Sequence, residues 1–158
     1  MKSNTHHLYI HIPFCKEICT YCDFYRTKTK DENIKLKYIE KIINEIKNDN
    51  NKYKTIYIGG GTPNFINNNS LSNLLSTLKN KLFDKDYEFT IECNPEFINQ
   101  SQIDIFKQNK VNRISIGVQT TNNEILKLLK RTHNIQTCIN AVSYTHLRCR
   151  RSHKCRSR

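Results

Sequence analysis

The sequence predicts an α/β protein with a parallel sheet, because short apolar runs alternate four times with helical apolar patterns along its 158 residues. Each short run has the composition of a buried strand, and each is followed by apolar residues at the helical period. Repeated strand–helix units form parallel sheets with right-handed crossovers, and ligands bind beyond the carboxyl ends of the strands. We therefore expect the functional residues to follow directly after each strand.

The first two strand–helix units occupy residues 8–82. Residues 8–14 are the first predicted strand, and a helix follows after a cysteine-rich loop. Residues 55–58 are the second strand, which ends in three glycines, and Ser70 is expected to cap the next helix. In both helices the apolar residues recur on one face. They are Ile39, Ile42, Ile43 and Ile46 in the first helix, and Leu71, Leu74, Leu75, Leu78 and Leu82 in the second.

The third and fourth units follow in the same order. Residues 87–93 are the third predicted strand, followed by a short helix that Ser101 can cap. Residues 111–119 are the fourth strand, and the helix after it ends near Arg131. A further helical pattern occupies residues 135–142. The chain thus contains about four βα units.

The composition is that of a soluble globular domain, with 37% hydrophobic and 25% charged residues. No stretch approaches the roughly 18–20 apolar residues that a membrane-spanning helix needs, so we expect no membrane span. The first apolar run is interrupted by His11 and Pro13, and it lacks the small-residue cleavage site of a signal peptide. These features predict a cytoplasmic location.

Half of the net charge of +12 lies at the end of the chain. Residues 142–158 contain six basic residues and no acid, whereas residues 1–141 contain 20 bases and 14 acids, a net charge of +6. Lys and Glu alternate along residues 35–47, which is typical of a solvated helix face. Nucleic acid is therefore not an expected partner. A zinc-stabilised RNA-binding module is a distant alternative, based on the basic charge and the cysteines.

The last residues differ in composition from the rest of the chain. Five of the eight arginines lie in residues 148–158, whereas Asn, Ile and Lys dominate the residues before them. The change occurs without a turn or linker and resembles a change of reading frame or joined foreign sequence. Cys149, Cys155, His146 and His153 are possible zinc ligands, but no apolar pattern surrounds them that could fold around a metal. We expect residues 1–142 to form the domain and residues 143–158 to be a non-native or disordered tail.

Three of the seven cysteines, Cys15, Cys19 and Cys22, lie within eight residues. This spacing suits metal ligation in a reducing compartment better than disulfide formation. A [4Fe-4S] cluster held by three thiolates has one iron open to another ligand. A structural zinc is the alternative, and its closed shell would need a fourth ligand such as His11 or Cys93.

Six motifs occur in order along the chain. They are Leu8-Tyr-Ile-His-Ile-Pro-Phe-Cys15, Cys15-x-x-x-Cys19-x-x-Cys22, Gly59-Gly-Gly-Thr-Pro63, Glu92-Cys-Asn-Pro95, Ser115-Ile-Gly-Val-Gln119 and Arg131-Thr-His133. Together they resemble the radical S-adenosylmethionine (SAM) family of oxygen-independent coproporphyrinogen III oxidases and the related HemW heme chaperones. The resemblance covers residues 8–141 and implies the N-terminal part of a radical SAM partial TIM-like (β/α)6 barrel.

The resemblance also implies which residues bind the cofactors. Cys15, Cys19 and Cys22 would hold the [4Fe-4S] cluster. The SAM-binding residues would be Tyr9, Tyr21, Gly60, Gly61, Thr62, Glu92, Gln119 and Arg131. Each also has an ordinary structural explanation, such as strand packing for Tyr9 or a cation at a helix end for Arg131. No residue of the chain is assigned a catalytic role.

Two functions are compatible with this resemblance. The oxidases use an electron from the cluster to cleave SAM and decarboxylate two propionates of coproporphyrinogen III, whereas the chaperones bind heme and transfer it to acceptor proteins. The oxidases typically have a fourth cysteine, in the pattern CxxxCxxCxC, but here Asp23-Phe24 follows Cys22 as in the chaperones. We therefore expect a heme chaperone, with heme or a porphyrin, heme-acceptor proteins and an electron donor as partners. The oxidase is the alternative, so enzyme activity is left open.

Overall fold

The computed structural model describes residues 6–149, and the side chains of residues 6–144. Its main sheet is fully parallel, with the strand order β1-β4-β5-β6. These strands are β1 (His7–Ile12), β4 (Thr55–Gly60), β5 (Glu88–Cys93) and β6 (Arg113–Ile116). A short parallel pair, β2 (Phe14–Cys15) and β3 (Thr27–Lys28), flanks the cysteine loop. The neighbours in the main sheet follow chain order, as expected of consecutive βα units.

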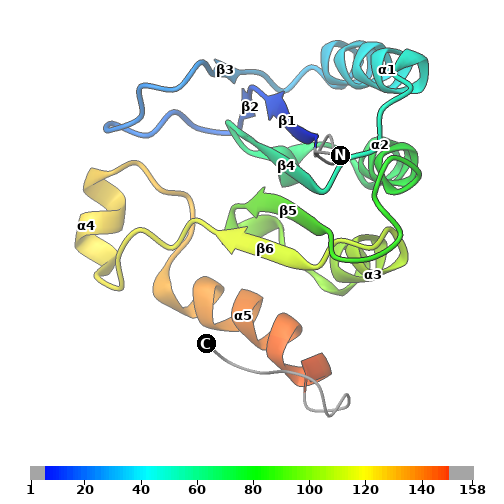
Figure 1. Cartoon of the computed structure of the whole chain (residues 1–158). Coiled ribbons are helices and arrows are strands. Elements are labelled where there is room, and N and C mark those ends of the chain that lie inside the picture. Colours follow the sequence, from blue (N-terminus) through cyan, green and yellow to red (C-terminus); the bar gives the residue numbers. More distant parts are fainter. Residues whose placement is uncertain (1–5, 150–158) are drawn as a thin grey trace.

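Helices cover one face of this sheet (Figure 1). That layer consists of α1 (Glu32–Asn48), α2 (Asn68–Lys79) and α3 (Gln100–Gln108). Two 3-10 turns, η1 (Pro63–Phe65) and η2 (Pro95–Phe97), come directly after β4 and β5. Beyond β6 lie α4 (Asn123–Leu128) and α5 (Ile135–Cys149), and α5 contacts η2 and α3. The predicted α/β class and the four strand–helix units are confirmed.

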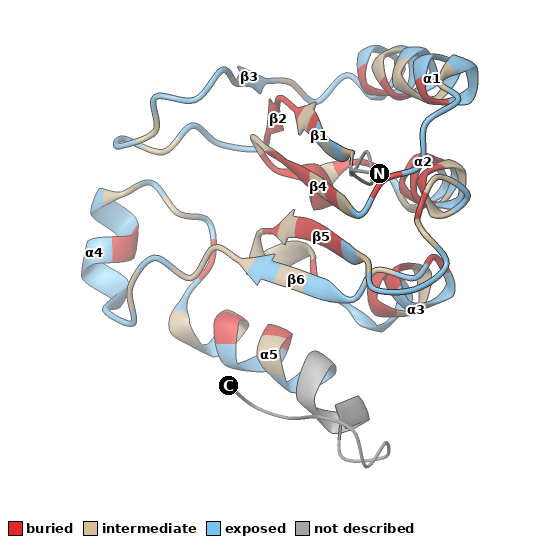
Figure 2. Cartoon of the chain, in the orientation of Figure 1, coloured by how far each residue is buried: buried red, intermediate tan, exposed pale blue. Residues whose placement is uncertain are grey.

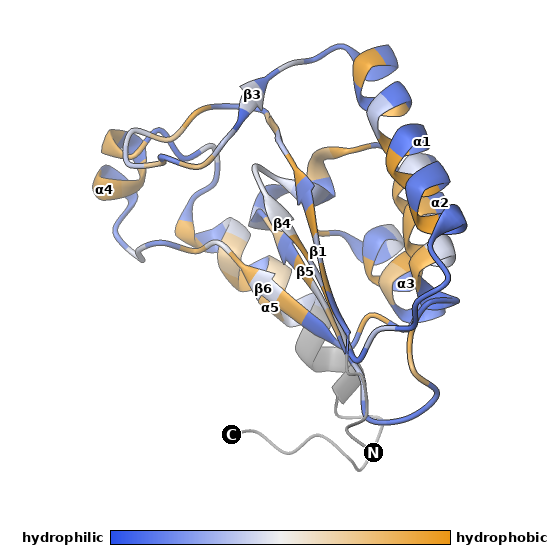
Figure 3. Cartoon of the chain, turned by 45° about the horizontal axis from the view of Figure 1, so that its top comes forward, coloured by the Kyte–Doolittle hydropathy of each residue, from blue (hydrophilic) through white to orange (hydrophobic). Residues whose placement is uncertain are grey.

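The core lies between the sheet and the layer formed by α1, α2 and α3. Buried residues line the sides of these helices that face the sheet (Figure 2), and the same sides are hydrophobic (Figure 3). Ile56 and Ile58 of β4 have no exposed surface, and neither do Leu74 and Leu75 of the predicted leucine stripe. Burying one such side chain contributes about 1.5–3 kcal/mol, so the spacing of apolar residues in the sequence determines this layer.

The opposite face of the sheet has polar and aromatic side chains. Tyr9 and His11 of β1, Tyr57 of β4 and Glu92 of β5 occupy the alternate strand positions, which point away from the helices. Tyr9 is 55% exposed. Because parallel sheets are usually covered on both faces, a polar and partly exposed face is unusual. A parallel sheet with a helix layer on its outer face is the arrangement expected of part of a TIM-like barrel.

Helix starts and one strand end differ from the sequence expectations. Asn67, not Ser70, caps α2, because its side chain accepts a hydrogen bond from the Ser70 N–H at 2.9 Å. Asn99 caps α3 in the same way, in place of Ser101. In each case an asparagine stands three residues before the helical N–H that it caps, and this reach favours the earlier side chain. β6 ends at Ile116 because the Val118 N–H turns back to the Ile116 carbonyl oxygen at 3.0 Å.

The expected tail, residues 143–158, lies only partly within the described residues. Helix α5 extends to Cys149, so the backbone of residues 143–149 continues the helix that begins at Ile135. Residues 150–158, which contain most of the arginines of the tail, lie outside the described residues. The non-native character of residues 143–158 stays a prediction. Within the part of the chain that the structure describes, no helix is long and apolar enough to span a membrane.

Candidate functional site

A cavity of about 390 Å³ opens where the carboxyl ends of the four parallel strands meet. Its wall comes from the loops that follow these strands, as the fold class predicts. The predicted ligands Cys15, Cys19, Cys22, Tyr21, Gly60, Gly61, Thr62, Glu92, Gln119 and Arg131 all line it. The structure therefore brings together ten of the eleven predicted site residues, although they are spread from residue 15 to residue 131.

Tyr9 is the predicted residue that does not line the cavity. Its ring stacks on Tyr57 with the ring centroids 6.0 Å apart, and its hydroxyl lies 3.1 Å from His11 Nδ1. Partial burial, followed by the negative charge of Glu92, raises the pKa of Tyr9. The structure accounts for Tyr9 by packing on the open face of the sheet, and its role beside SAM stays a prediction.

The three loop cysteines have different surroundings. Cys15 ends β2 and is buried, whereas Cys19 and Cys22 are partly exposed. Burial raises the pKa of the Cys15 thiol, and the hydroxyl of Thr62, 3.8 Å from Cys15 Sγ, opposes that rise. Arg131 Nη1 donates to Cys19 Sγ at 3.3 Å. Two of the three sulfur atoms thus face a hydrogen-bond donor, the Thr62 hydroxyl or the Arg131 guanidinium.

This set of donors fits an iron–sulfur cluster better than a single zinc ion. Among the residues that the structure describes, no three His, Cys, Asp or Glu side chains are arranged to hold one metal ion. His11 Nε2 donates to the Tyr25 carbonyl oxygen at 2.8 Å, and Cys93 is buried, which raises the pKa of its thiol. Both candidates for a fourth zinc ligand are therefore otherwise engaged or disfavoured as thiolate. Three cysteines around a cavity of this size suit a larger inorganic group.

Gly60 and Gly61 allow the end of β4 to pass close to the cysteine loop. Gly60 has a φ of +115°, in the left-handed region that favours glycine. A Cβ at Gly61 would lie 2.7 Å from the carbonyl group of Pro13 and 2.8 Å from Cys15 Sγ. The N–H of Gly60 donates to Glu92 Oε2 at 3.3 Å, and that of Gly61 donates to the Ile12 carbonyl oxygen at 2.8 Å. The close approach to Pro13 and Cys15 therefore requires glycine at position 61, whereas the backbone conformation and the contact with β1 require it at position 60.

Glu92 is held in the cavity wall by two donors. The hydroxyl of Tyr57 donates to Glu92 Oε1 at 2.5 Å, and the Gly60 N–H donates to Oε2. The hydrogen bond to this carboxylate raises the pKa of Tyr57 to about 12. A carboxylate fixed in this way has lone pairs left to accept hydrogen bonds from a ligand such as an ammonium group.

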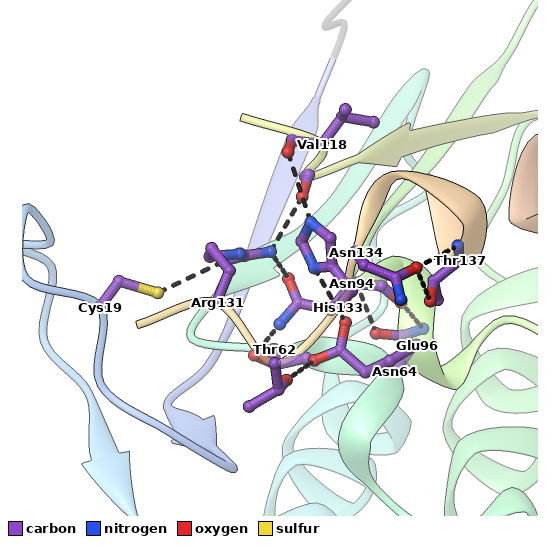
Figure 4. Close-up of polar contacts among 12 residues, drawn as sticks. Cys19, Thr62, Asn64, Asn94, Glu96, Val118, Arg131, His133, Asn134 and Thr137 are labelled. Atoms are coloured by element: carbon purple, nitrogen blue, oxygen red, sulfur yellow. Dashed lines mark hydrogen bonds and ion pairs between the residues drawn. The ribbon is translucent and has the colours of Figure 1, made fainter. Parts of the chain in front are cut away.

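Arg131 connects three loops around the cavity (Figure 4). Besides Cys19, its guanidinium contacts Asn94 Oδ1 at 2.7 Å and the Gly117 carbonyl oxygen at 2.9 Å, both through Nη2. Asn94 Nδ2 donates in turn to Thr62 Oγ1 at 3.3 Å. The arginine therefore joins the cysteine loop to the loops after β5 and β6, and its own segment follows α4.

Sequence patterns miss two asparagines of this network. Asn94-Pro95 by itself indicates only a turn. Asn94 directly follows the end of β5, however, so the rule that functional residues follow the strands could have identified it. Asn64 is buried, and its side chain brackets Asn94: Oδ1 accepts from the Asn94 N–H at 2.9 Å and Nδ2 donates to the Asn94 carbonyl oxygen at 3.1 Å. No sequence signal identifies Asn64, because an asparagine after Thr-Pro is expected to be solvated.

Comparison with protein families agrees with this geometry. The family model described as the radical SAM superfamily matches residues 9–150. The chain belongs to this superfamily. The family and the fold predicted from the six motifs are thereby confirmed. The similar curated sequences include proteins of two kinds.

The first kind is the heme chaperone. "Heme chaperone HemW" of Buchnera aphidicola subsp. Acyrthosiphon pisum is 40% identical over 141 residues, which cover 85% of this chain and 38% of that protein. The second kind is the oxygen-independent coproporphyrinogen III oxidase of Salmonella typhimurium, 31% identical over 130 residues, which cover 78% of this chain and 28% of that protein.

A solved radical SAM structure shows the same fold. The coproporphyrinogen III oxidase (HemN) from Escherichia coli superposes with a TM-score of 0.80 and 27% identity, covering 89% of this chain and 34% of that chain. The chain thus spans roughly a third of the length of these relatives.

Proposed function

We propose that the protein containing this chain is a radical SAM heme chaperone, which binds a [4Fe-4S] cluster, SAM and heme and transfers heme to acceptor proteins. The observation that carries this proposal is the cavity at the strand ends, where three cysteines face a carboxylate, an amide and a guanidinium. Membership of the radical SAM superfamily supports this proposal over a zinc-stabilised RNA-binding module.

Cys15, Cys19 and Cys22 are the residues that would hold the cluster. A bound cluster supplies an electron and one iron with an open coordination position for the amino and carboxylate groups of SAM. Thr62 directs its hydroxyl to Cys15 Sγ and Arg131 directs its guanidinium to Cys19 Sγ, so both would donate hydrogen bonds to sulfur atoms that hold the cluster. Burial of Phe14 and Cys15 at the base of the loop excludes water from that side of the site.

Three side chains of the cavity wall would orient SAM. Glu92 can accept a hydrogen bond from the SAM amino group, because Tyr57 and Gly60 fix its carboxylate. Arg131 Nε is a buried donor without a hydrogen-bond partner among the described residues, so it can donate to a carboxylate or ribose oxygen. Gln119 lines the same wall. Its positive φ of 66° turns the backbone away from the direction of β6, so its side chain does not continue the alternation of that strand.

Phe24 favours the chaperone over the oxidase. It stands two residues after Cys22, at the place of the fourth cysteine in the oxidase pattern, and it lines the cavity with 69% of its surface exposed. A phenyl ring cannot supply a thiolate. The HemW relative is also more similar than the oxidase, at 40% against 31% identity.

The test compares heme binding with decarboxylation in the full-length, anaerobically reconstituted protein. When heme binding is monitored by absorbance, we expect the titration to saturate at about one heme per chain. We expect incubation with coproporphyrinogen III, SAM and a reductant to yield no protoporphyrinogen. Multiple-turnover decarboxylation without heme binding would assign the oxidase function instead. Phe24→Cys is the informative variant, because it restores the thiol position of the oxidase pattern without altering the three cluster ligands.

A further inference from the structure

A buried acid–histidine pair lies behind the cavity wall, outside the set of predicted ligands. Glu96 belongs to η2, and His133 follows Arg131 after α4 (Figure 4). His133 Nδ1 lies 3.3 Å from Glu96 Oε2, with side-chain exposures of 0% and 12%. His133 Nε2 lies 3.3 Å from the Val118 carbonyl oxygen. Neither residue lines the cavity, so a direct contact with SAM does not explain them.

The surroundings of His133 fix the orientation of its ring. A carbonyl oxygen only accepts hydrogen bonds, so Nε2 carries a hydrogen that points to Val118. Nδ1 faces the Glu96 carboxylate at ion-pair distance, and neither Nδ1 nor Glu96 Oε2 has a hydrogen-bond partner among the described residues. Removing either partner of such a buried pair leaves the other group uncompensated, which is costly.

The pair fixes the segment that contains Arg131. Glu96 also accepts a hydrogen bond from the Thr132 hydroxyl, so two consecutive residues after Arg131 are tied to one carboxylate. The oxygen acceptors of Arg131 and the partners of His133 come from the same two segments, the one after β5 and the one after β6. Asn94 lies two residues before Glu96, and Gly117 lies directly before Val118. The position of Arg131 against Cys19 thus depends on how η2 holds residues 132 and 133.

We propose that Glu96 and His133 are a positioning pair, which holds the Arg131 guanidinium against Cys19 Sγ and thereby raises the reduction potential of the cluster. This inference rests on the proposed function, because it needs a cluster at Cys15, Cys19 and Cys22. Hydrogen bonds and positive charge at a cluster sulfur stabilise the reduced, more negative state. Loosening Arg131 therefore lowers the potential.

The sign of the change separates positioning from a direct charge effect. Glu96→Gln removes a negative charge, and through-space electrostatics alone would raise the cluster potential. Loss of the hydrogen bond from Arg131 to Cys19 would lower it. A purely structural role would reduce stability and leave the potential unchanged.

The experiment is a redox titration of the reconstituted full-length protein, followed by electron paramagnetic resonance (EPR). We expect Glu96→Gln to shift the midpoint potential to a more negative value. Arg131→Met, which removes the guanidinium itself, should shift it in the same direction and by more. His133→Gln is expected to act like Glu96→Gln, because a glutamine side chain can reach only one of the two partners of His133. In the double variant Glu96→Gln with Arg131→Met, the shift should not exceed that of Arg131→Met alone, since both changes act through one contact.

The matched control is Glu88→Gln, the same substitution at the amino end of β5, whereas Glu96 lies in η2 beyond its carboxyl end. Glu88 pairs with Arg113 at 2.9 Å, and the length of β5, about 17 Å at the rise of a strand, separates it from the loop that leads to η2, so the potential should not move. An unchanged or more positive potential in both Glu96→Gln and His133→Gln, with normal iron content, would overturn the inference and leave the proposed function intact. A wild-type protein that assembles no cluster would overturn both.

Discussion

Alanine at position 61 places a methyl group in the tightest contact between β4 and the cysteine loop. A Cβ there would lie 2.7 Å from the Pro13 carbonyl carbon and oxygen, whereas ordinary contacts begin at 3.4 Å, so one segment must move by about 0.7 Å. The atoms that it meets belong to the backbone and to the buried Cys15, and they cannot rotate away. Moving the loop also stretches the hydrogen bond from the Gly61 N–H to the Ile12 carbonyl oxygen, now 2.8 Å.

These two effects set the expected magnitude for Gly61→Ala. Overpacking costs about 1–3 kcal/mol, and a weakened backbone hydrogen bond adds about 0.5–1.5 kcal/mol. We therefore expect the free energy of unfolding to fall by about 2–4 kcal/mol. The assay is urea denaturation followed by far-ultraviolet circular dichroism, with the iron content of reconstituted protein as a second measurement. Iron content should fall as well, because the displaced segment carries Cys15.

Gly117→Ala is the matched control for this prediction. A Cβ at Gly117 would meet Arg131 Nη2 at 3.1 Å and Gln119 Nε2 at 3.2 Å, which are side-chain atoms at longer distances than the backbone atoms 2.7 Å from a Cβ at Gly61. We expect it to cost less than about 1 kcal/mol. A stability of Gly61→Ala equal to that of wild type, or a larger loss in Gly117→Ala, would refute the reasoning from close contacts.

Three further predictions concern pH, SAM binding and the end of the chain. Because the pKa of Tyr57 is raised from 10.0 to about 12 in the fold, its hydrogen bond to Glu92 contributes stability that is complete below pH 10 and is lost as the pH rises to about 12. Between pH 10 and about 12, the free energy of unfolding measured by urea denaturation should therefore fall less in Tyr57→Phe than in wild type. Equal decreases in the two proteins would contradict the stabilising role of this hydrogen bond. Glu92→Ala, Gln119→Ala and Arg131→Ala are each expected to weaken SAM binding, measured by calorimetry, while the cluster is retained; unchanged affinity in all three would remove them from the site. Deleting residues 143–158 is expected to leave the melting temperature of the folded part unchanged, and a clear decrease would show that these residues belong to the fold.

The strand–helix units can be predicted from the sequence because their signals are local. The apolar spacing of α1 and α2 and the short runs of β1, β4 and β5 determine the sheet and its outer helix layer. Helix caps were harder to predict, because asparagines and serines lie within three residues of each other at both sites and only the backbone geometry selects one. The strand ends were predicted well enough to place ten of eleven expected residues around one cavity.

The remainder of the site depends on contacts between distant residues. Asn64 and Asn94 are 30 residues apart, and nothing near either one indicates that the first is buried to bracket the second. The Glu96–His133 pair likewise forms only because α5 and η2 meet. The alternation of side chains along β1 places Tyr9 on the inner face, but only the structure shows that it packs on Tyr57 beyond the cavity wall.

The central claim is that Cys15, Cys19 and Cys22 hold a cluster with one iron open to SAM. It is tested most directly by EPR of the reduced, anaerobically reconstituted full-length protein with and without SAM, together with its iron content. We predict about four irons per chain and a signal that changes on adding SAM, both lost in Cys19→Ser and both kept in Cys93→Ser. A Cys19→Ser protein that retains the iron and the response to SAM would contradict the account.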